Sequence, residues 1–201
     1  MTMTMMRAVI RPAGLLAALK QCRTGDCASQ IVEFALSLPV LVLFVVGIFD
    51  FSGAISLKQK LTNAAREGAR VAASDPQNDL AASVPTSVWD SFWVVDNYLV
   101  SENINDCGLG APVTPTLTAG TLTWVATASG SGCPGSGINL TINRGYVTTI
   151  GTGANRVRLI GTRVTITYAY KWQFGNVAGL FGGTFAGPSN LTTTATAYNE
   201  N

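Results

Sequence analysis

The longest apolar segment of the chain lies near its N-terminus. No charged residue occurs from Phe34 to Phe49. With its flanks, Ala28 to Phe51, the run reaches the roughly 20 residues that a membrane helix needs. A removable secretory signal is the alternative, because "SGA" at Ser52–Ala54 has the small-x-small pattern that signal peptidase accepts. The length of the run and the long segment before it favour a retained transmembrane helix over residues 29–51.

An amphipathic helix is predicted to follow over residues 52–74. Small and apolar side chains recur there at helical spacing on one face: Leu57, Leu61, Ala64, Ala65, Gly68 and Ala72. Nothing breaks the pattern between Pro39 and Pro76, so residues 28–73 could form one rod of about 70 Å. Pro39 is expected to kink the helix within the membrane, and "SDP" at Ser74–Pro76 is expected to end it.

Residues 75–201 are predicted to form an α+β domain. Thr86 is a candidate N-cap for a second helix, Ser87–Ser101. Alternating or β-branched segments separated by glycine-rich turns then predict strands at Thr121–Ala128, Ile138–Asn143, Arg163–Tyr170 and Leu191–Tyr198. We expect an antiparallel sheet packed on the end of the long helix.

Composition and charge favour an extracytoplasmic location for this domain. Only 12% of the 201 residues are charged, against about 25% in an ordinary soluble domain. The stretches 107–143 and 172–199 carry no charge and are rich in Thr, Gly, Asn and Ser. A net charge of +2 without a basic patch argues against a nucleic-acid partner.

Residues 1–28 are interpreted as a basic cytoplasmic leader. Four cations, Arg7, Arg11, Lys20 and Arg23, face a single acid, Asp26. Four further cations, Lys58, Lys60, Arg66 and Arg70, follow the span about as closely as the cations of the leader precede it. The excess of positive charge that marks cytoplasmic loops is therefore not decisive. An orientation with the N-terminus inside depends partly on composition and on the cysteines.

The four cysteines form two sequence pairs, Cys22 with Cys27 and Cys107 with Cys133. Without histidine or a C-x-x-C motif, they argue against a zinc site. If the C-terminal domain lies outside the cytosol, Cys107 and Cys133 can form a disulfide worth roughly 3.5 kcal/mol in the chain-entropy model. Two unrelated buried thiols are the alternative. Cys22 and Cys27 would remain free on the reducing side.

Catalytic patterns are absent from the sequence. There is no histidine, no G-x-S-x-G and no phosphate-loop motif, and the glycine clusters are better read as turns. We therefore expect no enzyme activity, no cofactor and no metal. The aromatic side chains could form a binding patch, but packing between helix and sheet is the stronger interpretation. They are Trp89, Phe92, Trp93, Trp124, Tyr168, Tyr170 and Trp172.

Glu33 is an acidic residue just inside the start of the apolar run. An ionised acid inside a bilayer costs several kcal/mol, so it suggests a functional contact with a partner. The alternative is that Glu33 lies at the interface and reaches the headgroups at little cost. Position alone leaves the two readings equally open.

Residues 27–73 resemble the N-terminal signature of the TadE-like family, minor pseudopilins of tight adherence (Tad, Flp-type) pilus assembly. The matching motifs are V-E-F-A at 32–35, L-P at 38–39, G-I-x-D-F at 47–51 and L-T-N-A-A-R-E-G-A-R-x-A-A at 61–73. The resemblance implies a pilin-like helix, a single pass through the bacterial inner membrane and a periplasmic domain. It also implies partners: other pilins and pseudopilins, the Tad assembly platform, a prepilin peptidase and membrane lipid.

The resemblance also implies a role for Glu33. In pilin-like proteins an acid at the fifth mature position is thought to pair with a neighbouring subunit's N-terminal amine. Glu33 is fifth if the peptidase cleaves between Ala28 and Ser29, although the family usually has glycine where Ala28 stands. Cleavage between Gly25 and Asp26 would place Glu33 eighth, and an uncleaved membrane protein is the other alternative.

Two function hypotheses follow. The first is a pilus-assembly protein whose membrane helix docks against other pilin helices. The second is a membrane-anchored extracytoplasmic binding or adhesion domain that does not join a pilus and acts through its uncharged β surface.

Overall fold

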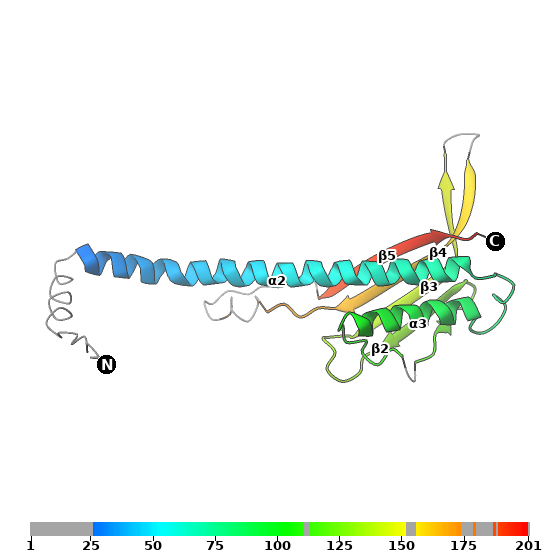
Figure 1. The fold of residues 1–201 in the computed structure, drawn as a ribbon, viewed down its shortest axis with the longest axis horizontal. Helices are drawn as coiled ribbons and strands as arrows, with labels where there is room; N and C mark the ends of the chain where they lie inside the picture. Colours follow the sequence, from blue (N-terminus) through cyan, green and yellow to red (C-terminus); the bar gives the residue numbers. More distant parts are fainter. Residues whose placement is uncertain are drawn as a thin grey trace, which may run out of the picture. The chain divides into compact units, whose positions relative to one another are not determined.

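The chain folds into a long helix, a second helix and an antiparallel sheet (Figure 1). The structure is a computed structural model that describes residues 26–110, 113–151, 156–173, 179, 187 and 189–200. Its elements are α2 (Asp26–Ser74), α3 (Thr86–Ser101), β1 (Thr116–Leu117), β2 (Thr123–Ala128), β3 (Ile138–Ile150), β4 (Val157–Ala169) and β5 (Asn190–Tyr198). The chain divides into two compact units, residues 1–47 and 48–201. The α+β fold class is confirmed.

The sheet is a five-stranded antiparallel meander in the order β1-β2-β3-β4-β5. All four predicted strands are present. The sequence pattern missed the two-residue β1 and the outer ends of β3 and β4, which pair from Tyr146↔Gly161 to Ile150↔Val157 beyond a register shift. Apolar residues are exposed on this outer hairpin, so burial does not impose on it the alternation by which strands are recognised.

Both helices agree closely with prediction. The bounds of α2 match the expected rod to within two residues, and the helix continues through Pro39. The predicted N-cap is wrong by one residue, because Thr86 is the first residue of α3 and Pro85 is the cap, in extended conformation. The amide nitrogen of Thr86 donates to Asp79 Oδ2 at 2.6 Å. A carboxylate seven residues away thus caps the helix.

The core of residues 48–201 lies between the sheet and the two helices. The predicted face of α2 is buried from Leu61 to Ala72, and Arg66 and Arg70 are exposed on the opposite side. Figure 1 shows α3 returning beside the C-terminal part of α2. Inward residues of the strands complete the core: Trp124, Ala126, Leu140, Ile142, Val164 and Ile166.

Gly68 permits the close approach of α2 to α3. A Cβ atom added at Gly68 would lie 2.6 Å from Val95 Cγ2 and 3.1 Å from Ser91 Oγ. Real Cβ atoms essentially never approach another atom as closely as the first distance. Valine in a helix has one strongly preferred rotamer, so Val95 cannot swing aside cheaply.

We predict that Gly68→Ala destabilises the domain by roughly 1–2 kcal/mol. Overpacking costs about 1–3 kcal/mol, and the better helix propensity of alanine returns up to about 1 kcal/mol. The measurement is the unfolding of the full chain in detergent, followed by circular dichroism. Arg66→Ala, on the exposed face, is the control. A Gly68→Ala/Val95→Ala double variant should cost less than the sum of the single changes, and strict additivity would contradict the contact.

Candidate functional site

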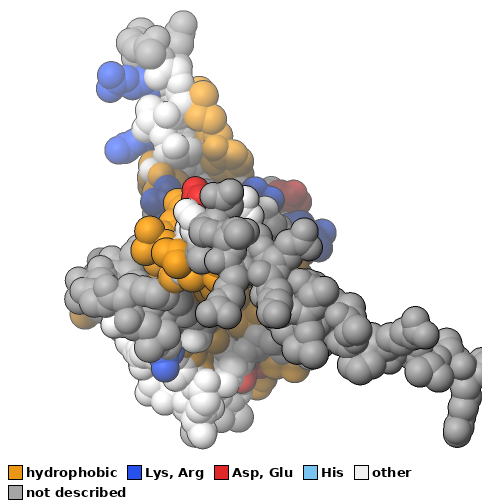
Figure 2. Space-filling model, turned by 90° about the vertical axis from the view of Figure 1, so that its left-hand side faces the viewer, with side chains coloured by type: hydrophobic (Ala, Val, Ile, Leu, Met, Phe, Trp, Pro, Cys, Tyr) orange, Lys and Arg blue, Asp and Glu red, His pale blue; other side chains and the backbone are white. Residues whose placement is uncertain are grey.

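The N-terminal part of α2 exposes an almost wholly apolar surface. Phe44 is 70% exposed and Phe49 is 74% exposed, and the most apolar 18-residue window has no buried residue. Hydrophobic side chains stand at the surface in the space-filling view of the end where α2 begins (Figure 2). Among the described residues, α2 is the one helix whose length and composition would allow it to cross a membrane. It could therefore anchor the chain in a membrane.

Glu33 shares one face of this helix with a small set of residues at helical spacing. The face holds Glu33, Leu36, Ser37, Val40, Leu41, Phe44 and Val45, which border a shallow apolar groove. The Ser37 hydroxyl donates to the Phe34 carbonyl at 3.1 Å, which satisfies its hydrogen bond within the helix. Glu33 is exposed, and no ion pair for it is found in the part of the chain that the structure describes. In lipid its carboxylate would need a partner from another molecule or access to headgroups.

The predicted processing positions lie at the start of α2. Asp26 is the first helical residue and Ser29 lies in the first turn, whereas Gly25 is outside the described residues. Ala28 is helical, but the structure does not describe its side chain. Cleavage therefore stays a prediction, as does a kink at Pro39.

The apolar run ends at a buried hydrogen-bonded acid. Asp50 is only 7% exposed, although it stands between the exposed Phe49 and Phe51. The Tyr170 hydroxyl approaches Asp50 Oδ1 at 3.0 Å and the Asp50 carbonyl at 3.2 Å. Burial and the contact with Asp50 raise the pKa of Tyr170, which keeps the hydroxyl protonated as a donor. The sequence pattern did not predict this link between α2 and the residue after β4.

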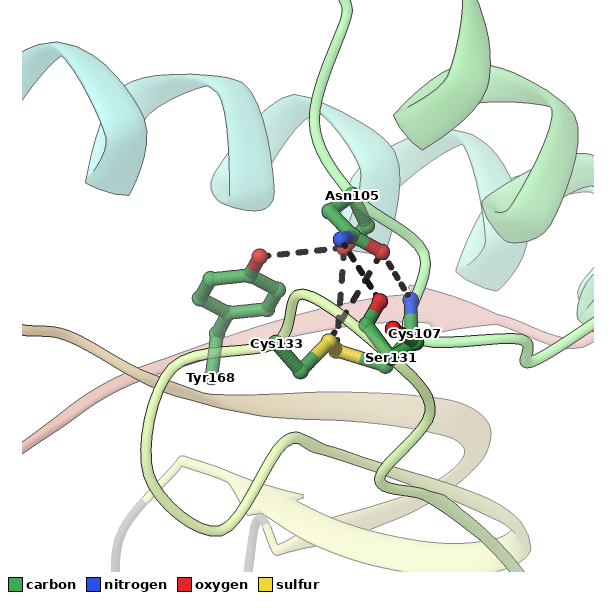
Figure 3. Close-up of a disulfide and its surroundings, with 5 residues drawn as sticks. All are labelled: Asn105, Cys107, Ser131, Cys133 and Tyr168. Carbon is green, nitrogen blue, oxygen red and sulfur yellow. Dashed lines mark hydrogen bonds between the residues drawn. A yellow bond between two sulfur atoms is a disulfide. The ribbon is translucent and has the colours of Figure 1, made fainter.

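Cys107 and Cys133 are joined as a disulfide, with Cα atoms 5.4 Å apart (Figure 3). The conditional expectation of pairing is met, and they are not separate thiols. Asn105 organises the surrounding loops: its Oδ1 accepts from the Cys107 amide at 2.9 Å, and its carbonyl accepts from the Tyr168 hydroxyl at 3.0 Å. The bridge therefore ties the loop after α3 to the turn before β3.

A pair of acids lies beside this loop. Asp96 on α3 is buried, and burial, with the nearby Asp106 carboxyl as a smaller cause, raises the pKa of Asp96 to about 6. The Oδ1 atom of Asp96 has no hydrogen-bond partner among the described residues. Periodicity placed the apolar face of α3 correctly but could not reveal that Asp106, ten residues later, folds back against it.

A second polar cluster lies where α2 ends, and the sequence pattern did not predict it. Arg144 is completely buried in β3; its guanidinium donates to Thr162 Oγ1 at 3.0 Å and to the Asp75 carbonyl at 3.1 Å. Burial lowers the pKa of Arg144, and the acids Asp75 and Asp79 oppose that change. Burial and the neighbouring Asp90 raise the pKa of Asp75. A carbonyl, a hydroxyl and nearby carboxylates thus compensate the buried cation, which ties the end of α2 to the sheet.

The aromatic residues divide between core and surface. Phe92, Trp124 and Tyr168 are buried, as the core interpretation expects, and Trp124 Nε1 donates to the Ser83 carbonyl at 2.8 Å. Trp93 is 42% exposed, which contradicts the core interpretation for that residue. The remaining three, Trp89, Tyr170 and Trp172, are half-buried.

Comparison with known proteins identifies the helical segment. Residues 28–70 match the family described as TadE-like protein. That pilus-associated family is not an enzyme family. The match contains the exposed apolar part of α2, Glu33 and most of the buried small-residue face. No curated protein and no solved structure shows a significant match to the chain.

We predict that Asp96 makes stability fall as pH rises. Its folded pKa of about 6 exceeds its ordinary value of 3.8, so the folded chain binds more protons than the unfolded chain between these values. This contribution is full below about pH 4 and is lost as pH rises through about 6. Asp96→Asn should raise the unfolding temperature at pH 7.5 and flatten its decline between pH 5 and 7.5. Glu67→Gln removes one negative charge from α2 on the side away from its buried face, and it controls for the change in net charge. An unchanged pH profile in Asp96→Asn would contradict the assignment of the pH dependence to Asp96.

Proposed function

We propose that this TadE-like chain is a pilus-assembly membrane protein, a minor pseudopilin that takes part in the biogenesis of Tad/Flp-type adhesive pili. The observation that carries the proposal is the exposed apolar face of α2 with Glu33 on it, inside the segment that matches the family. A helix with such a face needs lipid or other apolar helices around it. Docking against other pilin helices in the inner membrane meets that need.

Glu33 supplies the polar contact in this proposal. A carboxylate left alone in lipid costs several kcal/mol, whereas a cationic partner within the bilayer relieves much of that cost. The amine of a neighbouring subunit's mature N-terminus has the right charge. The contact would therefore favour assembled helices over isolated ones, and it would select a partner by charge as well as by shape.

The proposed topology places residues 1–28 in the cytoplasm, residues 29–51 across the inner membrane, and residues 52–74 and 75–201 in the periplasm. The disulfide supports this orientation, because disulfides persist in the periplasm and are rare in the cytosol. The proposed partners are other pilins and pseudopilins, the Tad assembly platform, the prepilin peptidase and membrane lipid.

We predict that Glu33→Ala and Glu33→Gln both abolish or strongly reduce piliation and copurification with the assembly platform. Both substitutions remove the charge, and Gln keeps nearly the same size. Ser37→Ala, on the same helix face one turn later, is the matched control and should leave piliation intact. Membrane levels of each variant must be equal by immunoblot. Normal piliation with Glu33→Gln would remove the carboxylate from the mechanism.

We predict that the mature protein begins at Ser29. Intact-mass and N-terminal peptide spectrometry of chain extracted from membranes should show loss of residues 1–28 when the peptidase is present. A mature start at Asp26 would place Glu33 eighth. Retention of the whole leader would remove the pairing with a mature N-terminal amine.

The second candidate is a membrane-anchored binding or adhesion domain that stays outside the pilus. The observation that favours it is the outer face of the sheet, where cross-strand threonine pairs form a polar surface next to Arg163. Thr165 and Thr194 hydroxyls lie 3.2 Å apart, as do those of Thr167 and Thr192. Glycan-array binding by the full chain, together with normal piliation in its absence, would favour this candidate over the first.

A further inference from the structure

An aromatic cluster lies where the apolar run gives way to the folded domain. The rings of Phe51 and Trp172 are 5.2 Å apart between centroids, and those of Tyr170 and Trp172 are 4.9 Å apart in an edge-to-face arrangement. Phe51 remains 54% exposed and Trp172 is half-buried. The cluster therefore presents aromatic surface without being part of the core.

Two segments far apart in the sequence build this cluster. Phe51 is the last residue of the predicted span on α2, whereas Tyr170 and Trp172 follow the end of β4 at Ala169. The hydrogen bonds from Tyr170 to Asp50 hold the second segment against the first. Between the two aromatics, Lys171 is exposed. The segment after β4 therefore places the sequence Tyr-Lys-Trp beside the end of the apolar run.

The spacing along α2 indicates where this cluster lies relative to a bilayer. Phe51 lies 18 residues after Glu33 in the sequence, close to the roughly 20 residues that a membrane helix needs. The hydrocarbon layer is about 30 Å thick. If the helix crosses the membrane with Glu33 just inside one boundary, Phe51 lies close to the opposite boundary.

We propose that Phe51, Tyr170 and Trp172 form an interfacial cluster that inserts among the lipid headgroups and seats the membrane-proximal end of the domain on the bilayer. Trp and Tyr are enriched at that depth because their rings are apolar and their N–H and O–H groups reach water. Lys171 adds a cation that can extend toward phosphate groups. This inference rests on the proposed membrane span.

The bond between Asp50 and Tyr170 has a specific part in this arrangement. A carboxylate at the lipid boundary is costly unless it is hydrogen-bonded. Tyr170 satisfies Asp50 from within the same chain, so the acid needs no partner from a neighbouring subunit. Asp50 differs in this respect from Glu33, which has no ion pair in the described part of the chain.

Tryptophan quenching by brominated lipids tests the cluster in the full chain. The protein is reconstituted into phosphatidylcholine–phosphatidylglycerol vesicles with bromine on the upper acyl carbons. Trp172→Phe removes the proposed interfacial indole but keeps a ring, and Trp93→Phe removes another partly exposed indole as the matched control. Phe44→Trp, made in the Trp172→Phe background, reports whether the middle of the apolar run is in lipid.

The expected result is that the lipid-dependent quenching of the natural chain is lost in Trp172→Phe and retained in Trp93→Phe. Quenching that persists in Trp172→Phe, while the tryptophan at position 44 is also quenched, would overturn the interfacial cluster and leave the span in place. Absence of quenching at position 44 would overturn the span and the cluster together.

Discussion

The close packing of the small-residue face of α2 is the contact on which the rest of the domain depends. Gly68 and the alanines around it let α3 approach α2, and the same face packs against the sheet. Because these side chains are small, most of the apolar volume of the core comes from the partners, including Phe92, Trp124 and Leu140. A larger residue at Gly68 would act on all of them, since a dense core transmits displacement.

The same helix must satisfy two different surroundings. Its N-terminal part exposes apolar side chains that favour lipid or other apolar helices, and its C-terminal part buries one face and exposes Arg66 and Arg70 to water. Asp50 stands at the change between the two, and Tyr170 supplies its hydrogen bond. Because backbone hydrogen bonds are satisfied inside a helix in both surroundings, one continuous element can serve both.

Two sets of contacts, one near each end of α3, tie the segments that flank this helix to the sheet. Near its start, Arg144 of β3 holds the end of α2 through the Asp75 carbonyl. After its end, the Cys107–Cys133 bridge and Asn105 connect the following loop to the turn before β3 and to Tyr168 of β4. The first is a buried cation compensated by oxygen atoms and the second is covalent. Together they limit how far the α3 segment can move from the sheet.

The sequence by itself determined the elements whose burial follows a local period. The small-residue face of α2, the apolar face of α3 and the inner strand segments show repeats of 3.6 or 2 residues, because one side of each faces the core. The apolar run is recognised instead by its unbroken length. Only the tertiary structure decided that Asp50 meets Tyr170, that Asp106 lies against Asp96 and that Arg144 is buried. These contacts join positions 10 to 120 residues apart and depend on strand register and on loop paths, which a local pattern does not encode.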